Sequence, residues 1–276
     1  MRQKTLFSIF AWIVLSPLML LVLFPFAVMI STALKPRTEV FAENVQWLPH
    51  SIDFGPLLDV ILSPAFQRAL WNSAVIAVIS SVATLIVATP GAYALSRYNF
   101  TGRRIVRQSL LVGQMISPII LVLGIFRLAA ALGLINSVWG LTIILVAINT
   151  SFVTWILQNY FDTIPKEIEE AAYVDGASLF RIVTTIFVPL ALPALGVGLM
   201  FTFINAWNEF VLALTMLRTN ETHTLPIYVY SLEAGRYSVD WNVVMAGTLL
   251  TTVLIGLICA FLQRSFVSGL SQGAEK

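Results

Sequence analysis

Six stretches of the sequence are apolar over enough residues to cross a lipid bilayer, and they constrain the fold more than any other feature. They cover residues 9–33, 72–95, 109–129, 137–157, 189–215 and 243–263. About 20 helical residues cross a hydrocarbon core about 30 Å thick, and backbone polar groups inside lipid must be bonded within the segment. Since 58% of the 276 residues are hydrophobic and only 11% are charged, we expect an all-α polytopic membrane protein. Its six transmembrane helices form a single domain over residues 1–276.

The basic residues between these stretches predict the orientation of the chain, because cytoplasmic connections are enriched in Lys and Arg. With the N-terminus inside, ten basic residues lie on the inner side: Arg2, Lys4, Arg97, Arg103, Arg104, Arg107, Lys166, Arg181, Arg264 and Lys276. Only five lie on the outer side: Lys35, Arg37, Arg68, Arg218 and Arg236. We therefore expect both termini in the cytoplasm. The first stretch is too long for the apolar part of a signal peptide, so we expect it to be a retained span.

The remaining composition excludes several classes of function. A net charge of +2, with dispersed basic residues, argues against a nucleic-acid partner. The single cysteine, Cys259, and the two distant histidines, His50 and His223, support neither a metal site nor a histidine-based catalytic set. No phosphate-binding loop that ends in Gly-Lys-Ser/Thr is present. We expect a protein that is not itself an enzyme and that binds no cofactor.

One polar connection, residues 164–190, is more specific. Pro165 suits a helix start, and Glu167, Glu169 and Glu170 place negative charge near the positive end of that helix. A face of the helix carries Ile168 and three small or acidic residues, Ala171, Ala172 and Asp175. Gly176 can end the helix in a left-handed conformation, and Ser178 can cap the next one. The helix either rests on the bilayer or binds a protein, and repulsion between its acids and an anionic leaflet favours a protein.

The same segment resembles the EAA loop, about residues 164–189, of binding-protein-dependent ABC transporter permeases. The matching positions are Glu170-Ala171-Ala172, Gly176, Ile186 and Pro189, with Val188 where leucine is usual. Weaker matches to the carbohydrate-uptake branch follow in the same order along the chain: Leu34-Lys35-Pro36, Asn72-Ser73, Ala92 to Arg97, Phe100 to Arg103, Leu132 to Asn136, Trp207 to Phe210, Thr224 to Pro226 and Gln263 to Leu270. Residues 124–128 depart from the usual pattern.

The resemblance implies the type I importer permease fold in a bacterial-type plasma membrane, with a cytoplasmic coupling helix. It implies that Glu170, Ala171, Ala172 and Asp175 dock on a dimer of ATPase subunits, and that Gly176 makes a required turn. ATP and Mg²⁺ would be bound by that ATPase, not by this chain. The other implied partners are a second permease subunit, an extracytoplasmic solute-binding protein and a sugar or polyol. The tail after Arg264 either reaches the ATPase, as in similar permeases, or is a disordered end.

A polar face in the fifth stretch is the candidate solute pathway. Thr202, Asn205, Asn208 and Glu209 recur at helical spacing, and polar groups in a membrane helix usually face a bundle or a wet cavity. Trp207 offers a flat surface to a sugar ring. Alternatively, Asn208 and Glu209 bond to other helices and Trp207 belongs to the outer aromatic belt.

Two other classes of function stay open at this point. A self-sufficient, ion-coupled secondary transporter or channel would place ionisable groups near the middle of the membrane, whereas Arg127 and Glu209 are expected toward its outer side. A membrane scaffold or receptor would transport nothing. Copurification of an ATPase and a second permease is expected only of an importer subunit.

Overall fold

The structure is a computed structural model that describes residues 2–41, 46–234 and 239–273, with the side chains in these ranges except those of residues 2–11, 14, 118 and 262–273. All regular structure in the described ranges is helical. The chain divides into two compact units. Unit 1 comprises Met1–Gln67 and Tyr228–Leu254, and unit 2 comprises Arg68–Ile227 and Ile255–Lys276.

Unit 1 is held together around the connection that follows the first helix. It contains α1 (Arg2–Ala33), α2 (Arg37–Val40), α3 (Gly55–Leu62) and the first part of α14 (Trp241–Gly273). The Arg37 guanidinium lies 2.7 Å from the Asp240 carboxylate. The Asn242 amide donates to the Lys35 carbonyl at 3.5 Å. The Leu34-Lys35-Pro36 stretch thus forms a polar junction between the end of α1 and the start of α14.

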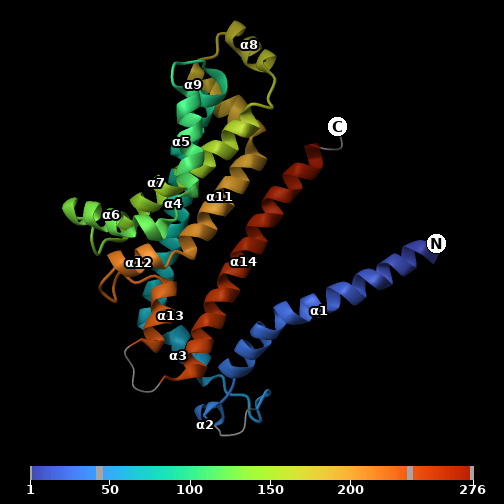
Figure 1. Ribbon diagram of the computed structural model, residues 1–276, viewed down its shortest axis with the longest axis vertical. Helices are drawn as coiled ribbons and strands as arrows, with labels where there is room; N and C mark the ends of the chain where they lie inside the picture. Colours follow the sequence, from blue (N-terminus) through green and yellow to red (C-terminus); the bar gives the residue numbers. More distant parts are fainter. Residues whose placement is uncertain (1, 42–45, 235–238, 274–276) are drawn as a thin grey trace. The chain divides into compact units, whose positions relative to one another are not determined.

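Unit 2 contains the helices that position the candidate site. They are α4 (Pro64–Arg97, from Arg68 onward), α5 (Arg103–Met115), α6 (Pro118–Ala131), α7 (Val138–Phe161), α8 (Lys166–Val174), α9 (Leu179–Ile182), the π-helical η1 (Val183–Phe187), α10 (Val188–Leu190), α11 (Leu192–Trp207), α12 (Val211–Met216) and the start of α13 (Leu225–Glu233). Helix α7 packs against α5 and α11, and α12 packs against α6. Helix α8 lies beyond the ends of α5 and α7 (Figure 1).

Within the described ranges, four helices are long and apolar enough to cross a membrane without interruption: α1 over Leu15–Ala33, α4, α7, and α14 over Trp241–Phe261. Two bent helix pairs raise the number of spans in the described ranges to six if each pair is one span. Helices α1 and α4 continue through Pro25 and Pro90. In the two bent pairs, by contrast, a proline lies at or beside the break.

The third expected span, residues 109–129, is not one helix. It is divided between α5 and α6, whose axes differ by 104°. Ser117 is extended, with ψ at 130°, because the ring of the following Pro118 disfavours a helical residue before it. A count of apolar residues alone does not detect this bend, but Pro118 inside the stretch is a local signal for it.

The fifth expected span, residues 189–215, is also wrong as a continuous helix. Its first break is at Ala191, where the segments Leu179–Leu190 and Leu192–Trp207 meet at 80°. Its second break comprises Asn208 to Phe210, between α11 and α12. There the Glu209 carboxylate accepts the backbone N–H of Leu212 at 2.8 Å, which satisfies a free donor of the first turn of α12 and favours a new helix start.

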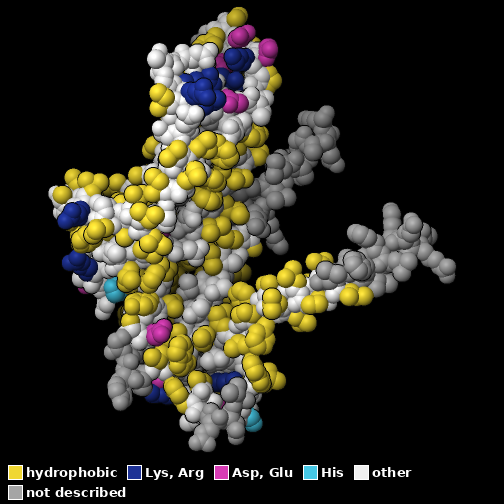
Figure 2. Space-filling view, viewed as in Figure 1, with side chains coloured by type: hydrophobic (Ala, Val, Ile, Leu, Met, Phe, Trp, Pro, Cys, Tyr) yellow, Lys and Arg dark blue, Asp and Glu magenta, His cyan; other side chains and the backbone are white. Residues whose placement is uncertain are grey.

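The buried core of unit 2 joins α4, α7 and the segment from α8 to α11. It consists of Ala88, Ala92, Tyr93, Val153, Leu157, Phe161, Ile164, Ala172, Ile182, Phe187, Ala191 and Ala194. The rings of Tyr93 and Phe161 both meet the Phe187 ring edge-on, at centroid distances of 4.9 and 5.3 Å. Charged side chains gather at the end of the unit where α8 and α9 lie, whereas apolar side chains cover much of the remaining visible surface (Figure 2).

Candidate functional site

Helix α8 is a nine-residue helix with defined signals at both ends. It begins at Lys166, directly after Pro165. At its other end, Gly176 has a φ of 77°, which confirms the left-handed turn predicted for this residue. The N–H groups of Ala177 and Gly176 donate to the carbonyls of Ala172 and Tyr173, each at 3.0 Å, in the Schellman pattern. The Ser178 hydroxyl then accepts the Arg181 N–H at 3.4 Å, as expected of a cap for α9.

The two faces of α8 differ sharply in exposure. Glu170, Ala171, Asp175 and Gly176 are exposed, whereas Glu169 and Ala172 are buried. The expected outward face therefore needs a correction at Ala172. This residue is only 8% exposed and belongs to the core beside Ile182 and Phe187, because positions three apart on a helix share a face and Glu169 points inward. We define the outer face of α8 as Glu170, Ala171 and Asp175.

The buried acid on α8 is held by residues of α4. The Glu169 carboxylate lies 3.0 Å from the Arg97 guanidinium and accepts the Tyr93 hydroxyl at 2.5 Å. Arg97 also donates to the Ile164 carbonyl at 2.7 Å, just before α8 begins. Its guanidinium lies over the Phe187 ring at 4.9 Å from the centroid. A bonded charge pair of this kind fixes the inner face of α8 against the end of α4.

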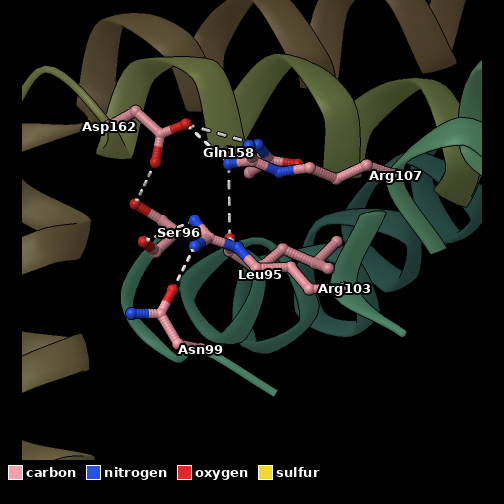
Figure 3. Close-up of polar contacts among 7 residues, drawn as sticks. All are labelled: Leu95, Ser96, Asn99, Arg103, Arg107, Gln158 and Asp162. Carbon is pink, nitrogen blue, oxygen red and sulfur yellow. Dashed lines mark hydrogen bonds and ion pairs between the residues drawn. The ribbon is translucent and has the colours of Figure 1, made fainter. Parts of the chain in front are cut away.

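A second polar group ties together the ends of α4, α5 and α7 (Figure 3). The Asp162 carboxylate accepts the Ser96 hydroxyl at 2.7 Å and an Arg107 N–H at 2.8 Å. Arg103 donates to the carbonyls of Leu95 and Ser96 at 2.8 and 3.1 Å. These carbonyls belong to the last turn of α4, where no further helical N–H is available to them. The Arg-rich connection predicted to be cytoplasmic thus caps α4 and forms a rigid support next to α8.

A small polar cleft of about 190 Å³ opens beside α8. It is lined by Arg97, Tyr98, Lys166, Glu169, Glu170 and Tyr173. Desolvation, with a smaller contribution from the neighbouring Tyr173, raises the pKa of Tyr98 above its ordinary value. An ordinary phenol is already protonated at neutral pH, so this shift leaves Tyr98 uncharged beside the cleft.

The residues expected to line a solute pathway do not all share one exposed face, since Thr202 is buried. Asn205 is exposed and donates to the Asn149 side chain of α7 at 3.4 Å. Asn208, also exposed, closes α11 by donating to the Ile204 carbonyl at 2.9 Å. Glu209 is used as the cap of α12. Since α11 ends at Trp207, the helical spacing that placed these residues on one face does not extend to Glu209.

Trp207 needs a separate correction, because it is neither open to a solute nor part of an exposed aromatic belt. Its side chain is 1% exposed and lies against the Phe203 ring, with centroids 5.7 Å apart. Among the described residues, its indole N–H finds no hydrogen-bond partner. Burial of the ring in the packing around α11 explains why a sugar cannot reach it in this conformation.

Three of the stretches that resemble the carbohydrate-uptake branch meet around the connection between α12 and α13. They are Asn72-Ser73, Leu132 to Asn136 and Thr224 to Pro226. Asn136, with a φ of 57°, uses its side-chain oxygen to accept the Arg218 and Thr219 N–H groups at 2.9 and 3.1 Å and the Thr222 hydroxyl at 2.8 Å. Asn72 donates to the carbonyls of Glu221 and His223, both at 2.9 Å. The connection over residues 217–224 is thereby held in one conformation.

Sequence reasoning missed Arg97, Glu169 and Asp162 as organising residues. Glu169 entered only as a charge near the helix dipole, and Arg97 only as a charge for orientation and as the end of the matching stretch Ala92 to Arg97. The available signal was the three-residue spacing of Glu169 and Ala172, which gives an inward face once Ala172 is buried. Asp162 carried no comparable signal, because its partners come from two other helices. The side chains of the tail over residues 263–270 lie outside the description.

A family model, "Binding-protein-dependent transport system inner membrane component", matches residues 80–272, which include α8 and every contact described around it. This chain belongs to that family. Its α8 corresponds to the EAA segment from which the resemblance started. The apolar spans found here agree with a membrane-spanning permease.

Among the permease's relatives is the permease protein YcjP of Escherichia coli, 33% identical over 100% of this chain and 99% of that protein. The trehalose/maltose transport system permease protein MalG of Thermococcus litoralis is 32% identical to this chain, over 100% of this chain and 99% of that protein. The diacetylchitobiose uptake system permease protein DasC of Streptomyces coelicolor is 32% identical to this chain, over 92% of this chain and 91% of that protein.

A solved structure confirms the fold of the permease. It is that of a bacterial ABC transporter involved in the import of the acidic polysaccharide alginate, with a TM-score of 0.83, 25% identity, and coverage of 96% of this chain and 98% of that chain. The chain therefore has the type I importer permease fold, as the sequence predicted. It is a permease subunit of a binding-protein-dependent ABC importer.

Proposed function

We propose that this permease forms half of the translocation pathway for a carbohydrate or a related polyol, and that its helix α8 couples the pathway to a separate ATPase. The names of its relatives support the solute class, since diacetylchitobiose, trehalose and maltose are all sugars. ATP and Mg²⁺ would be bound by the ATPase dimer. A second permease subunit and an extracytoplasmic solute-binding protein complete the assembly.

The observation on which the coupling role rests is the two-sided character of α8. Its inner face is fixed by the Arg97–Glu169 ion pair and by Ala172 in the core. Its outer face presents Glu170, Ala171 and Asp175 to the surroundings. A helix that rested on an anionic leaflet would place these acids beside like charge. A small, acidic surface on a rigid support suits a protein groove, in which small side chains permit close approach.

In the proposed mechanism, closure of the ATPase dimer on ATP moves α8, and the permease pair opens toward a loaded solute-binding protein. Such switching requires that ATP bind the two conformations with different free energies. The orientation follows from the basic connections, with α8 and both termini in the cytoplasm. The connection over 217–224 would then lie outside, where a solute-binding protein arrives.

Reconstitution tests this function directly. The chain is coexpressed with the ATPase, permease and binding-protein genes beside its own, and the purified complex is placed in liposomes. We expect ATP hydrolysis to be stimulated by the loaded binding protein, with sugars or polyols as the effective solutes. Solute movement by the purified chain alone, without nucleotide, would instead assign it to the ion-coupled transporters or channels.

A further inference from the structure

Arg97, the last residue of α4, contacts three different segments at once. Its guanidinium lies 3.0 Å from Glu169 of α8, donates to the Ile164 carbonyl before α8 and covers the Phe187 ring of η1. The segments on both sides of the α8 turn therefore meet at one side chain. Helix α4 continues through Pro90, where one backbone hydrogen bond is missing, so displacement of Arg97 reaches the rest of α4 through the remaining bonds of the helix.

The pair is buried, and each partner makes one further hydrogen bond. The side chains of Arg97 and Glu169 are 5% and 11% exposed, and the Tyr93 hydroxyl occupies the second carboxylate oxygen. An exposed ion pair is screened by water and contributes little rigidity. Here, loss of either charge leaves the other buried without a counter-charge, which is strongly unfavourable. Separation of the two charges is therefore costly, which favours movement of α8 and the end of α4 as one unit.

We propose that Arg97 and Glu169 are positioning residues that transmit the movement of α8 to α4. The inference rests on the proposed function, in which an ATPase moves α8, and adds the route by which the pathway receives that movement. The backbone itself also connects α8 to η1, through the turn at Gly176. No atom lies within 4 Å of the position that a Cβ would occupy at Gly176. The ion pair, together with the Tyr93 hydroxyl on Glu169, connects α8 directly to a membrane-spanning helix.

Distance measurements separate transmission from simple stabilisation. Spin labels are placed at Val174 of α8 and Val78 of α4, which are 88% and 50% exposed, after Cys259→Ser removes the single cysteine. In the complete complex, we expect the label distance to stay constant when ATP binds, because α8 and α4 move together. In the Glu169→Gln complex we expect it to change. The same response in both complexes, whether constant or altered, would overturn the proposal.

Uptake per ATP hydrolysed gives the functional test. We expect Glu169→Gln and Arg97→Gln each to lower this ratio at least about fivefold, the scale of typical coupling between sites. The ATPase should still copurify. The double variant should recover most of the ratio, because two neutral amides can hydrogen-bond to each other. The matched control is Arg104→Gln, which removes an exposed arginine of α5, and it should leave the ratio unchanged.

The outcomes distinguish the two proposals. If the ATPase copurifies with all variants and the ratio does not fall in the single variants, the transmission role is wrong and the proposed function stands. If the single variants lose the ATPase, Glu169 and Arg97 belong to docking, and the transmission role is again wrong. If the ATPase fails to copurify with the unaltered chain, the proposed function itself fails.

Discussion

The Ala177 N–H donates to the Ala172 carbonyl at 3.0 Å, and this bond closes α8 because Gly176, between them, has a φ of 77°. The turn directs the chain from α8 into α9 immediately beyond the outer face of α8. It also keeps Ala172 in the core while Ala171 and Asp175 stay exposed. A change in this turn therefore alters the presentation of α8 without removing a core side chain.

Replacement of Gly176 by alanine or leucine should uncouple ATP hydrolysis from uptake. No atom lies within 4 Å of an added Cβ, so the cost is that of the left-handed backbone, about 1–2 kcal/mol, and membrane insertion should persist. Gly102→Ala is a matched control, since Gly102 has a φ of 95° and equally open surroundings but precedes α5. Uptake per ATP should fall only for the Gly176 variants, and an unchanged ratio would contradict the role of this turn.

Charge reversal on the outer face of α8 should weaken the ATPase complex. Glu170→Lys and Asp175→Lys alter exposed side chains, so the fold should be retained. A mismatched charge in a protein interface costs several kcal/mol, so we expect at least about a tenfold loss of affinity. Binding of the purified ATPase to the permease in nanodiscs measures the loss. Asp59→Lys, at an exposed position of α3, is the control, and equal effects at all three positions would refute a docking face on α8.

Asn136 should be required for the conformation of the connection over 217–224. Asn136→Gly keeps the left-handed backbone accessible but leaves the Arg218 and Thr219 N–H groups without their acceptor. The loss of folding free energy is about 1–3 kcal/mol if water does not replace that acceptor. Asn136→Asp retains an acceptor oxygen and should behave nearly as the natural chain. The readouts are thermal unfolding in detergent and stimulation of ATP hydrolysis by the binding protein. If Gly and Asp variants behave alike, the side-chain oxygen is not the organising group.

Trp207 should matter for packing and not for solute affinity. Trp207→Ala should destabilise the permease by about 3–5 kcal/mol, the usual cost of a large core truncation. Trp207→Phe should be mild, because the indole N–H has no partner within the described structure. The solute concentration that gives half-maximal uptake should be the same for Trp207→Phe and the natural chain. A large shift in that concentration would restore Trp207 as a solute contact.

The sequence predicted the membrane class and the helix and turn of α8 because both depend on local signals. Apolar length marks a span, and Gly176 marks a helix end whatever surrounds it. Pro118 and Pro193 are local signals for bends in the third and fifth spans, whereas the size of each bend, 104° and 80°, depends on packing that a local pattern does not specify. The Arg97–Glu169 pair was missed because it joins residues 72 positions apart. Long-range pairing of this kind depends on the packing of α4, α7 and α8, which a local pattern does not specify.

The most direct test of the account is a photo-crosslink from the outer face of α8. A photoreactive residue replaces Ala171, which is exposed, and the complete transporter is irradiated in native-like membranes with and without ATP. We predict a crosslink to the nucleotide-binding subunit, identified by mass spectrometry, whose yield changes when ATP binds. A crosslink to lipid alone, with the ATPase present in the same complex, would contradict the claim that α8 couples the permease to its motor.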